Sequence, residues 1–599
     1  MSAALHARDA DETRPLLHDH DDHPHSYHSA SSSRTQSPEP AEPPSLNKIS
    51  RSDLIWVLAG LWSAVFLGAL DGTIVATLLS PIGSYFNESN RSSYIGTSYL
   101  LSVCCFTPLY GRLSDILGRK GAMLLALSLF GSGTLFCGLA PSMDALIVAR
   151  AVAGMGGGGV MTVSSVAVTD LIPLRQRGLY QGMTNILFGL GAGLGGPLGG
   201  WMNDILGWRS AFLLQMPILV FSFCLVALKV SIRLPDEIEN QPVRAKLRRI
   251  DVLGSFTLVG TVGALLLGLS LKSTEELPWA HPLIWGLLLA SAVFGAAFIW
   301  VETCWSPFPV MPMRLIRMRT PLFVSLSNFF GSVAAFSMIY NVPLVSSSPC
   351  GLLRWPSTDT AMPGLHLLPH SVRTRMSSVG VLSDPAARWP YPREACLLDG
   401  QVMRRTGKLY SLTLCSCLLT VVAAALVARW NEHSPAWHLW LDVAPQGFGM
   451  AAVITSTLIA MIASVSREDL AVATGITYLF RTTGQVIGVS LSGALLQAIL
   501  TTKLRERIHG PNAIEIIDQI RHSTTIIPQL SPELRKAAVD SYADALRVVF
   551  ICQAVLNFMC FLCCLPIQEN PLPGSHEEQE EAWKRRDSNR TESDGEESP

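Results

Sequence analysis

Runs of about twenty apolar residues recur along most of this chain and constrain its fold more than any other feature. Residues 54–79, 94–110 and 121–140 are the first three, and similar runs continue to residue 567. An α-helix needs about 20 apolar residues to cross the hydrocarbon core of a bilayer. The 599 residues are 49% hydrophobic and only 15% charged, whereas a soluble chain carries more charge. The sequence therefore predicts an all-α, polytopic membrane protein.

We expect fourteen spans, of which thirteen are clear. Spans one to nine are expected at about 54–79, 94–110, 121–140, 145–168, 179–200, 211–230, 252–271, 283–301 and 321–342. Spans eleven to fourteen are expected at about 409–428, 441–464, 470–500 and 545–567, with a long mixed-charge luminal loop before the last. The chain then divides into a disordered cytosolic tail (1–52), an N-terminal six-helix bundle (53–233), a linker with two extra transmembrane helices (234–320), a C-terminal six-helix bundle (321–567) and a disordered acidic cytosolic tail (568–599).

A short charged turn, GRLSDILGRK at residues 111–120, separates the second and third apolar runs. Its excess of Arg and Lys predicts that it faces the cytosol. An ordinary positively charged loop is the simpler interpretation, but the register of glycines and charges favours a specific motif. The motif residues are Gly111, Arg112, Asp115, Gly118, Arg119 and Lys120.

Three charged residues lie inside expected spans: Asp71, Arg150 and Arg481. Charges inside a bilayer are costly, so they are functional candidates. Burial raises the proton affinity of a carboxyl group, and a nearby cation lowers it. An acid that moves between these two environments can take up and release a proton. A buried structural pair or a brace between helices is the alternative for each residue.

Glycines crowd the end of the fifth span. Small residues four apart allow two helices to touch backbone to backbone, and a proline kinks or ends a helix. Generic small-residue packing is the alternative to a functional motif. The motif residues are Gly189, Gly193, Gly196, Pro197, Gly199 and Gly200.

Other features suggest where the chain goes and what it lacks. Asn87 and Asn90 begin glycosylation sequons in a predicted luminal loop. Glu12, Leu16 and Leu17 resemble an acidic-dileucine signal that a sorting adaptor would bind. The cysteines lie mostly in apolar runs without disulfide or metal-ligand spacing, so we interpret them as packing residues. We expect no metal, no cofactor, no nucleic-acid partner and no enzyme activity.

The turn pattern G-x-L-x-D-x-x-G-R-K resembles the signature loop of the major facilitator superfamily, and GPLGG at 196–200 resembles the antiporter motif of its proton-driven exporters. Fourteen spans fit the drug:proton antiporter branch of that superfamily. Within that branch, the strings LDGT at 70–73, DLIPLRQRG at 170–178 and YLFRTTGQ at 478–485 look most like fungal vacuolar basic amino acid transporters. The resemblance covers about 53–345 and 403–567.

The resemblance implies a major facilitator fold of two six-helix bundles plus two linking helices. It implies a monomer in the vacuolar membrane, with both termini cytosolic, that moves lysine, arginine or histidine inward in exchange for protons. Asp71 would face a central cavity, Arg150 would tune its affinity, and Asp115 with Arg112 and Arg119 would hold the cytosolic gate shut. The rival functions are a drug, toxin or siderophore exporter of the plasma membrane and, more distantly, a non-transporting nutrient sensor.

Residues 345–402 depart from this pattern and degrade the tenth span. The segment holds five arginines and seven prolines, and one central arginine costs roughly 2.5–3.5 kcal/mol on insertion scales. Only the string GLHLLP at 364–369 resembles the start of a span. We interpret the segment as retained intron sequence or a shifted reading frame. Sequencing the transcript should show a main message that replaces these residues with an apolar span, whereas an uninterrupted, abundant message encoding them would contradict this interpretation.

Overall fold

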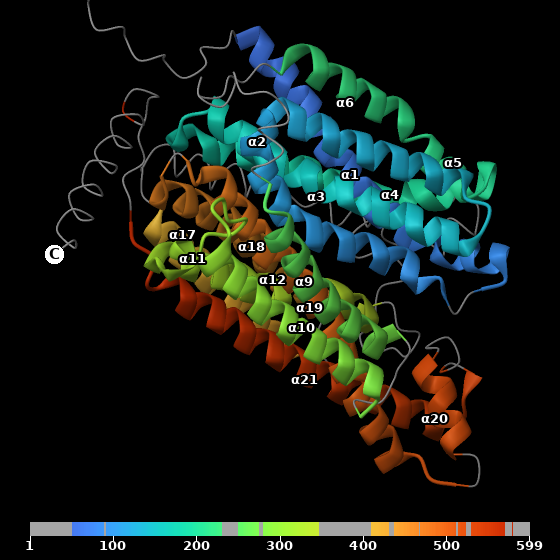
Figure 1. The fold of residues 1–599 in the computed structure, drawn as a ribbon. Coiled ribbons are helices and arrows are strands. Elements are labelled where there is room, and N and C mark those ends of the chain that lie inside the picture. The colour runs from blue at the N-terminus through green and yellow to red at the C-terminus, as the bar shows by residue number, and fades with distance from the viewer. Residues whose placement is uncertain are drawn as a thin grey trace, which may run out of the picture. The chain divides into compact units, whose positions relative to one another are not determined.

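The computed structural model describes a protein built from long helices (Figure 1). The described residues are 51–88, 91–230, 250–274, 280–346, 409–430, 436–466, 468–510, 513–522, 527, 529–569 and 578. Within these ranges every regular element is helical, and eleven helices are long and apolar enough to cross a membrane. The expectation of an all-α polytopic membrane protein is confirmed.

The N-terminal half contains α1 (Arg51–Phe86), α2 (Ser93–Leu139), α3 (Met143–Leu171), α4 (Leu174–Leu206), α5 (Ser210–Leu213) and α6 (Met216–Lys229). The long helix α2 holds both the second and the third expected span. Its two parts meet at Gly118, where φ is +82°, a conformation that glycine adopts without steric cost. Helix α4 is not among the eleven apolar helices but covers the fifth expected span.

The second half begins with α9 (Val252–Thr274), α10 (Pro282–Trp300), the π-helical turn η2 (Val301–Trp305), α11 (Met313–Arg317) and α12 (Arg319–Ser346). It continues with α17 (Tyr410–Ala428), α18 (Ala436–Ser464), α19 (Leu470–Arg507), α20 (Ala513–His522) and α21 (Pro532–Cys564). These helices cover spans seven to nine and eleven to fourteen. The expected tenth span, residues 1–50 of the N-terminal tail, all of the C-terminal tail except 568, 569 and 578, Asn90 and the signal residues Glu12, Leu16 and Leu17 lie outside the described residues. Asn87 is exposed in the turn after α1.

Glycines set the packing of α2 against α3. A Cβ atom placed on Gly156 would lie 2.2 Å from the Phe130 backbone nitrogen, and one on Gly133 would lie 2.3 Å from the Ala153 nitrogen. Real Cβ atoms do not approach this closely, so only glycine lets these two backbones touch. Helices in lipid associate through such close packing, because lipid tails are as apolar as the side chains.

Helix α9 joins the two halves. In the C-terminal half, α12 packs against α19 and α21, and α17 packs against α18 and α21. Helix α9 pairs with α10 and also contacts both α2 and α19. The Cys105 thiol on α2 donates a weak hydrogen bond to the Val259 carbonyl on α9, with a sulfur–oxygen distance of 3.8 Å. The linking helix α9 therefore lies at the interface between α2 and α19.

The long mixed-charge connection before the last expected span is partly helical in the residues that the structure describes. Helix α19 continues to Arg507, α20 follows, and α21 begins at Pro532. Leu504, Ile520 and Ala538 are buried together in one apolar cluster, and the Tyr542 hydroxyl donates to the Ile520 carbonyl at 3.1 Å. The connection therefore packs through apolar side chains of its own.

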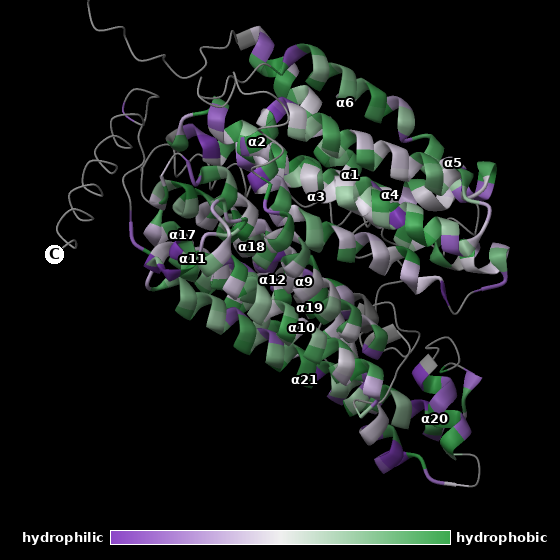
Figure 2. Ribbon diagram, in the orientation of Figure 1, coloured by the Kyte–Doolittle hydropathy of each residue, from purple (hydrophilic) through white to green (hydrophobic). Residues whose placement is uncertain are grey.

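Polar residues gather near the ends of the long helices, whose lengths are mostly apolar (Figure 2). We call the end that carries residues 111–120 the loop end, and the opposite one the far end. Ion pairs tie helices together at the loop end. Lys229 on α6 lies 3.1 Å from Asp53 on α1, and Arg314 on α11 lies 2.7 Å from Asp469 beside α19. Such partly exposed pairs add little stability individually, but they fix which helix ends are neighbours.

Candidate functional site

The centre of the candidate site is an ion pair buried in the N-terminal half. Asp71 on α1 and Arg150 on α3 meet with 2.6 Å between Oδ2 and Nη1, and their side chains are 0% and 1% exposed. Removing one partner of such a pair costs about 3–5 kcal/mol, whereas replacing both by well-packed apolar residues is often neutral. The pair therefore adds little net folding stability over two well-packed apolar residues, so stability alone does not explain its presence.

Tyr99 on α2 completes the surroundings of Arg150. The Arg150 guanidinium lies 4.2 Å from the centre of the Tyr99 ring, a geometry in which the ring face attracts the cation. Two glycines of α3 make this approach possible. A Cβ atom on Gly154 would lie 2.4 Å from the Tyr99 carbonyl oxygen, and one on Gly157 would lie 2.7 Å from its hydroxyl.

One carboxylate oxygen of Asp71 is left without a hydrogen-bond donor. Its Oδ1 and the Nε of Arg150 are both buried and have no partner in the part of the chain that the structure describes. A carboxylate oxygen with open lone pairs can accept a proton or the N–H group of a cation. Asp71 has no exposed surface, so the expectation that it faces an open cavity does not hold for this conformation, in which Arg150 and the packed helices cover it.

Helix α4 lies against α1 on both sides of Asp71. A Cβ atom on Gly191 would lie 2.4 Å from the Phe66 carbonyl oxygen, and one on Gly195 would lie 2.8 Å from the Leu70 carbonyl oxygen. We call Gly191, Gly195 and Gly199, which are spaced four apart, the glycine seam. The seam therefore lets the α1 backbone and the Thr73 and Thr77 hydroxyls pack directly against the α4 backbone next to the ion pair.

The seam differs in register from the glycine motif read from the sequence. Gly199 belongs to both, and its Cβ atom would lie 2.6 Å from the Thr77 hydroxyl, but Gly200 has nothing within 4 Å. Pro197 lies inside α4 and does not end it. The other motif glycines lie on the same helix, Gly189 and Gly193 half-buried and Gly196 buried. Gly195 and Gly199 are one of several glycine pairs spaced four apart in the sequence, and where nearly every residue is small the spacing alone does not select the contacting face.

At the loop end, Arg119 forms ion pairs with two acidic residues. Its Nη1 lies 2.6 Å from Asp115 Oδ1, and its Nε lies 2.6 Å from Asp170 Oδ2 at the end of α3. The same Nη1 donates to the Ser114 hydroxyl at 3.3 Å. The sequence analysis named Asp170 only as the first residue of the DLIPLRQRG string. Its contact with Arg119 depends on the fold and was not predicted.

The two glycines of the turn have different structural roles. A Cβ atom on Gly111 would lie 2.8 Å from the Ala471 carbonyl oxygen and 3.3 Å from the Gly475 Cα on α19, so Gly111 allows the two halves to touch. Gly118 supplies the positive φ that joins the two parts of α2. The turn is therefore built both to reverse direction and to close against α19.

Arg112 and Lys120 do not join the acid cluster around Arg119. The Arg112 guanidinium lies 5.8 Å from the centre of the Phe308 ring, in the segment after η2. Lys120 is half-buried. The expected grouping of Asp115 with both arginines is therefore found only for Arg119, while Arg112 reaches toward the linking helices.

Two further residues at the interface between the halves escaped the sequence analysis. The Asn185 amide on α4 donates to the Thr455 hydroxyl on α18 at 3.2 Å. Arg177, ahead of span five, is fully buried and donates to the Ser165 carbonyl at 3.0 Å. Burial lowers the pKa of Arg177 to about 9, while Tyr478 acts in the opposite direction, so it stays charged at neutral pH.

Arg481 lies apart from the Asp71–Arg150 pair. It is half-buried on α19, with its guanidinium 5.6 Å from the centre of the Tyr478 ring. No carboxylate pairs with it among the residues that the structure describes. The structure thus joins two of the three predicted intramembrane charges and leaves the third on the opposite half.

Comparison with known proteins identifies relatives over most of the chain. The model of the Major Facilitator Superfamily matches residues 61–364. The chain is 38% identical to "Multidrug resistance protein fnx1" of Schizosaccharomyces pombe, over 86% of this chain and 92% of that protein. It is 32% identical to "Vacuolar basic amino acid transporter 1" of Saccharomyces cerevisiae, over 76% of this chain and 81% of that protein. The crystal structure of the human organic anion transporter MFSD10 shares the fold, with a TM-score of 0.50, 14% identity and coverage of 86% and 98%.

The contact at Gly111 predicts how the loop end opens. In Gly111→Ala the new Cβ atom would press on the Ala471 carbonyl, and such overpacking costs about 1–3 kcal/mol, which corresponds to a shift of about 5- to 150-fold against the closed state. Cysteines placed at Asn185 and Thr455 report closure by forming a disulfide. We expect less cross-linking in Gly111→Ala than in Gly96→Ala, a control on the same helix with nothing within 4 Å. Equal cross-linking in both would contradict this role for Gly111.

Proposed function

Because the chain belongs to the Major Facilitator Superfamily, we propose that it is a proton-coupled antiporter that moves lysine, arginine and histidine across the vacuolar membrane. Its membership of this family makes it a multi-pass membrane transporter of small molecules and not an enzyme. The observation that carries the proposal is the fully buried Asp71–Arg150 pair with one open carboxylate oxygen. The name of the vacuolar relative from Saccharomyces cerevisiae supports both the substrate class and the membrane.

The pair provides a way to exchange a proton for a cationic substrate. In the closed state Asp71 is paired with Arg150 through Oδ2. A proton on the carboxylate and a substrate ammonium or guanidinium both compete with Arg150 for the same charge. Because a single buried carboxylate cannot hold both well, binding of one favours release of the other. This competition is the core of an antiport cycle.

Opening the pair to the substrate requires the helices around it to move. Transporters of this kind bind near the bilayer midplane and expose that site to each side in turn by rocking one half against the other. The glycine seam brings α4 against α1 beside Asp71, and Asn185 on α4 links that helix to Thr455 on α18. Gly111 and the Arg119 cluster close the loop end in the same conformation. We propose that these contacts form the gate and that Arg481 contributes to the site from the C-terminal half.

The orientation and organisation follow from the same proposal. The loop end faces the cytosol, both termini are cytosolic, and the far end, with Asn87, faces the lumen. The working unit is a monomer of two six-helix bundles with α9 and α10 between them. A sorting adaptor that binds the acidic-dileucine signal of the N-terminal tail would deliver it to the vacuole.

Efflux of drugs or toxins across the plasma membrane is the second candidate function. It is favoured by the 38% identity to a protein named for multidrug resistance. The ion pair and the gate would serve either substrate class, so a transport assay distinguishes the two.

Uptake into vacuolar-membrane vesicles tests the substrate and the coupling. With the vesicles acidified by ATP, we expect labelled lysine, arginine and histidine to accumulate only when this protein is present, because proton exit drives their entry. A protonophore should abolish the accumulation. If the protein is present in that membrane and none of the three accumulates, the basic amino acid proposal fails and efflux is favoured.

Variants of the ion pair test its role in coupling. Asp71→Asn leaves the Arg150 charge buried alone, and we expect a loss of about 3–5 kcal/mol of folding stability together with loss of uptake. The double variant Asp71→Asn with Arg150→Gln removes both charges, so it should recover a normal gel-filtration profile and thermal stability without recovering uptake. Protonophore-sensitive uptake at the wild-type rate by the double variant would show that the pair is only structural.

A further inference from the structure

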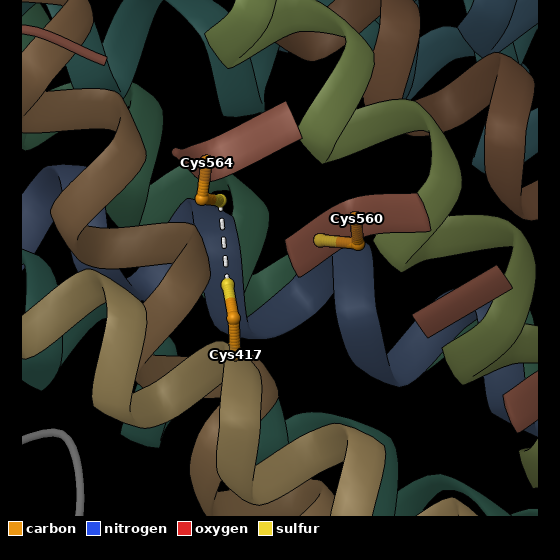
Figure 3. Close-up of side chains that lie close together, drawn as sticks. All are labelled: Cys417, Cys560 and Cys564. Atoms are coloured by element: carbon orange, nitrogen blue, oxygen red, sulfur yellow. Dashed lines mark hydrogen bonds between the residues drawn. The ribbon is translucent and has the colours of Figure 1, made fainter. Parts of the chain in front are cut away.

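Three thiols meet inside the C-terminal half, away from the ion pair and the gate. Cys417 on α17 and Cys560 and Cys564 on α21 are buried, and their sulfur atoms all lie within 4.8 Å of one another (Figure 3). The sulfurs of Cys417 and Cys564 are 3.3 Å apart. The sequence indicated only packing residues, because Cys417 lies far along the chain from the other two.

Helix packing brings the three sulfurs together. Cys560 and Cys564 are four residues apart and therefore share one face of α21. Helix α17 packs against that face, and the Tyr410 hydroxyl at its start donates to the Leu565 carbonyl just after α21, with a 3.0 Å distance. This bond fixes the two helices in the register that sets Cys417 opposite Cys564.

The geometry suits a metal ion bound by sulfur alone. A metal–sulfur bond of about 2.3 Å places three sulfurs around one ion about 4 Å from each other, so the cluster would need to shift by less than about 1 Å. Thiolate and thioether ligands select copper(I), zinc or iron–sulfur clusters, and a set of three sulfurs favours copper(I) over zinc, which is almost always four-coordinate in structural sites. The Met450 thioether is a neighbour of Cys560 across Gly331. A Cβ atom on Gly331 would lie 3.3 Å from the Cys560 sulfur and 3.4 Å from the Met450 sulfur.

We propose that Cys417, Cys560 and Cys564 bind one copper(I) ion. Copper(I) accepts three sulfur ligands without a fourth, and one thiolate balances its single charge, so the site is neutral when the other two cysteines bind as thiols. Each thiol that binds as thiolate releases its proton to solvent, and the oxidation state of the metal does not change. The three buried cysteines lie near the end of α21 at the loop end, and a bound ion would hold α17 against α21.

Metal binding by the full-length protein tests this proposal. The purified protein, reduced and in detergent, is mixed with copper(I) held by a chelating buffer, and separately with silver(I), which does not undergo redox change. After gel filtration we expect one ion per chain, and X-ray absorption should show only sulfur neighbours at about 2.2–2.3 Å. Failure of the wild-type protein to retain either ion would overturn the proposal.

Matched variants locate the bound ion. Cys417→Ser and Cys564→Ser should weaken copper(I) binding by on the order of 100-fold, because even outer-shell changes cost 10–100-fold. Cys415→Ser on α17 and Cys552→Ser on α21 replace exposed cysteines of the same helices and should leave binding unchanged. Equal binding by the Cys417→Ser variant would overturn the site.

A second measurement covers variants that fail to fold. In the wild-type protein, silver(I) should protect Cys417, Cys560 and Cys564 from alkylation while leaving Cys415 and Cys552 reactive, as mapped by mass spectrometry. Protection of all five cysteines alike, or of none, would contradict a specific site. Formation of a Cys417–Cys564 disulfide in air, without any metal retained after reduction, would replace the metal site with a thiol pair.

Discussion

A charge buried in a membrane protein must be neutralised, and this requirement organises the N-terminal half. Asp71 and Arg150 are both buried away from solvent. If either residue is removed, the charge of the other stays buried without a partner, at a large desolvation cost. The glycines of α3 bring Tyr99 over Arg150, and the glycines of α4 bring that helix against the stretch of α1 that carries Asp71. The local sequence of three helices therefore serves one neutral pair.

The same helices connect the pair to the contacts between the halves. Helix α3 carries Arg150 near its start and Asp170 at its end, where Arg119 binds it. Helix α4 carries the seam near Asp71 and the Asn185 contact with α18. A change in the protonation of Asp71 would alter the balance of charge on two helices that also close the loop end. In the proposed cycle, proton binding would change the gate position through these shared helices, as exchange across a membrane requires.

Much of this fold could be predicted from the sequence, because spans are set by length and hydrophobicity alone. The helices of the described residues cover spans one to nine and eleven to fourteen. Individual intramembrane charges were also recognisable, since they are rare and costly. The sequence could not show which residues on separate helices contact each other. The Asp71–Arg150 bond, the place of Asp170 beside Arg119 and the meeting of Cys417 with Cys564 all depend on which faces of separate helices touch. The glycine motif shows the same limit, because only Gly199 of the motif residues belongs to the seam.

The most direct test of the central claim is proton release on substrate binding. The purified wild-type protein in weakly buffered detergent solution, tested over a series of pH values, should release protons when it binds lysine, measured with a pH indicator alongside calorimetric binding. The variant with both Asp71→Asn and Arg150→Gln should release none. Lysine binding without proton release by the wild-type protein, or equal release by both proteins, would contradict exchange at this pair.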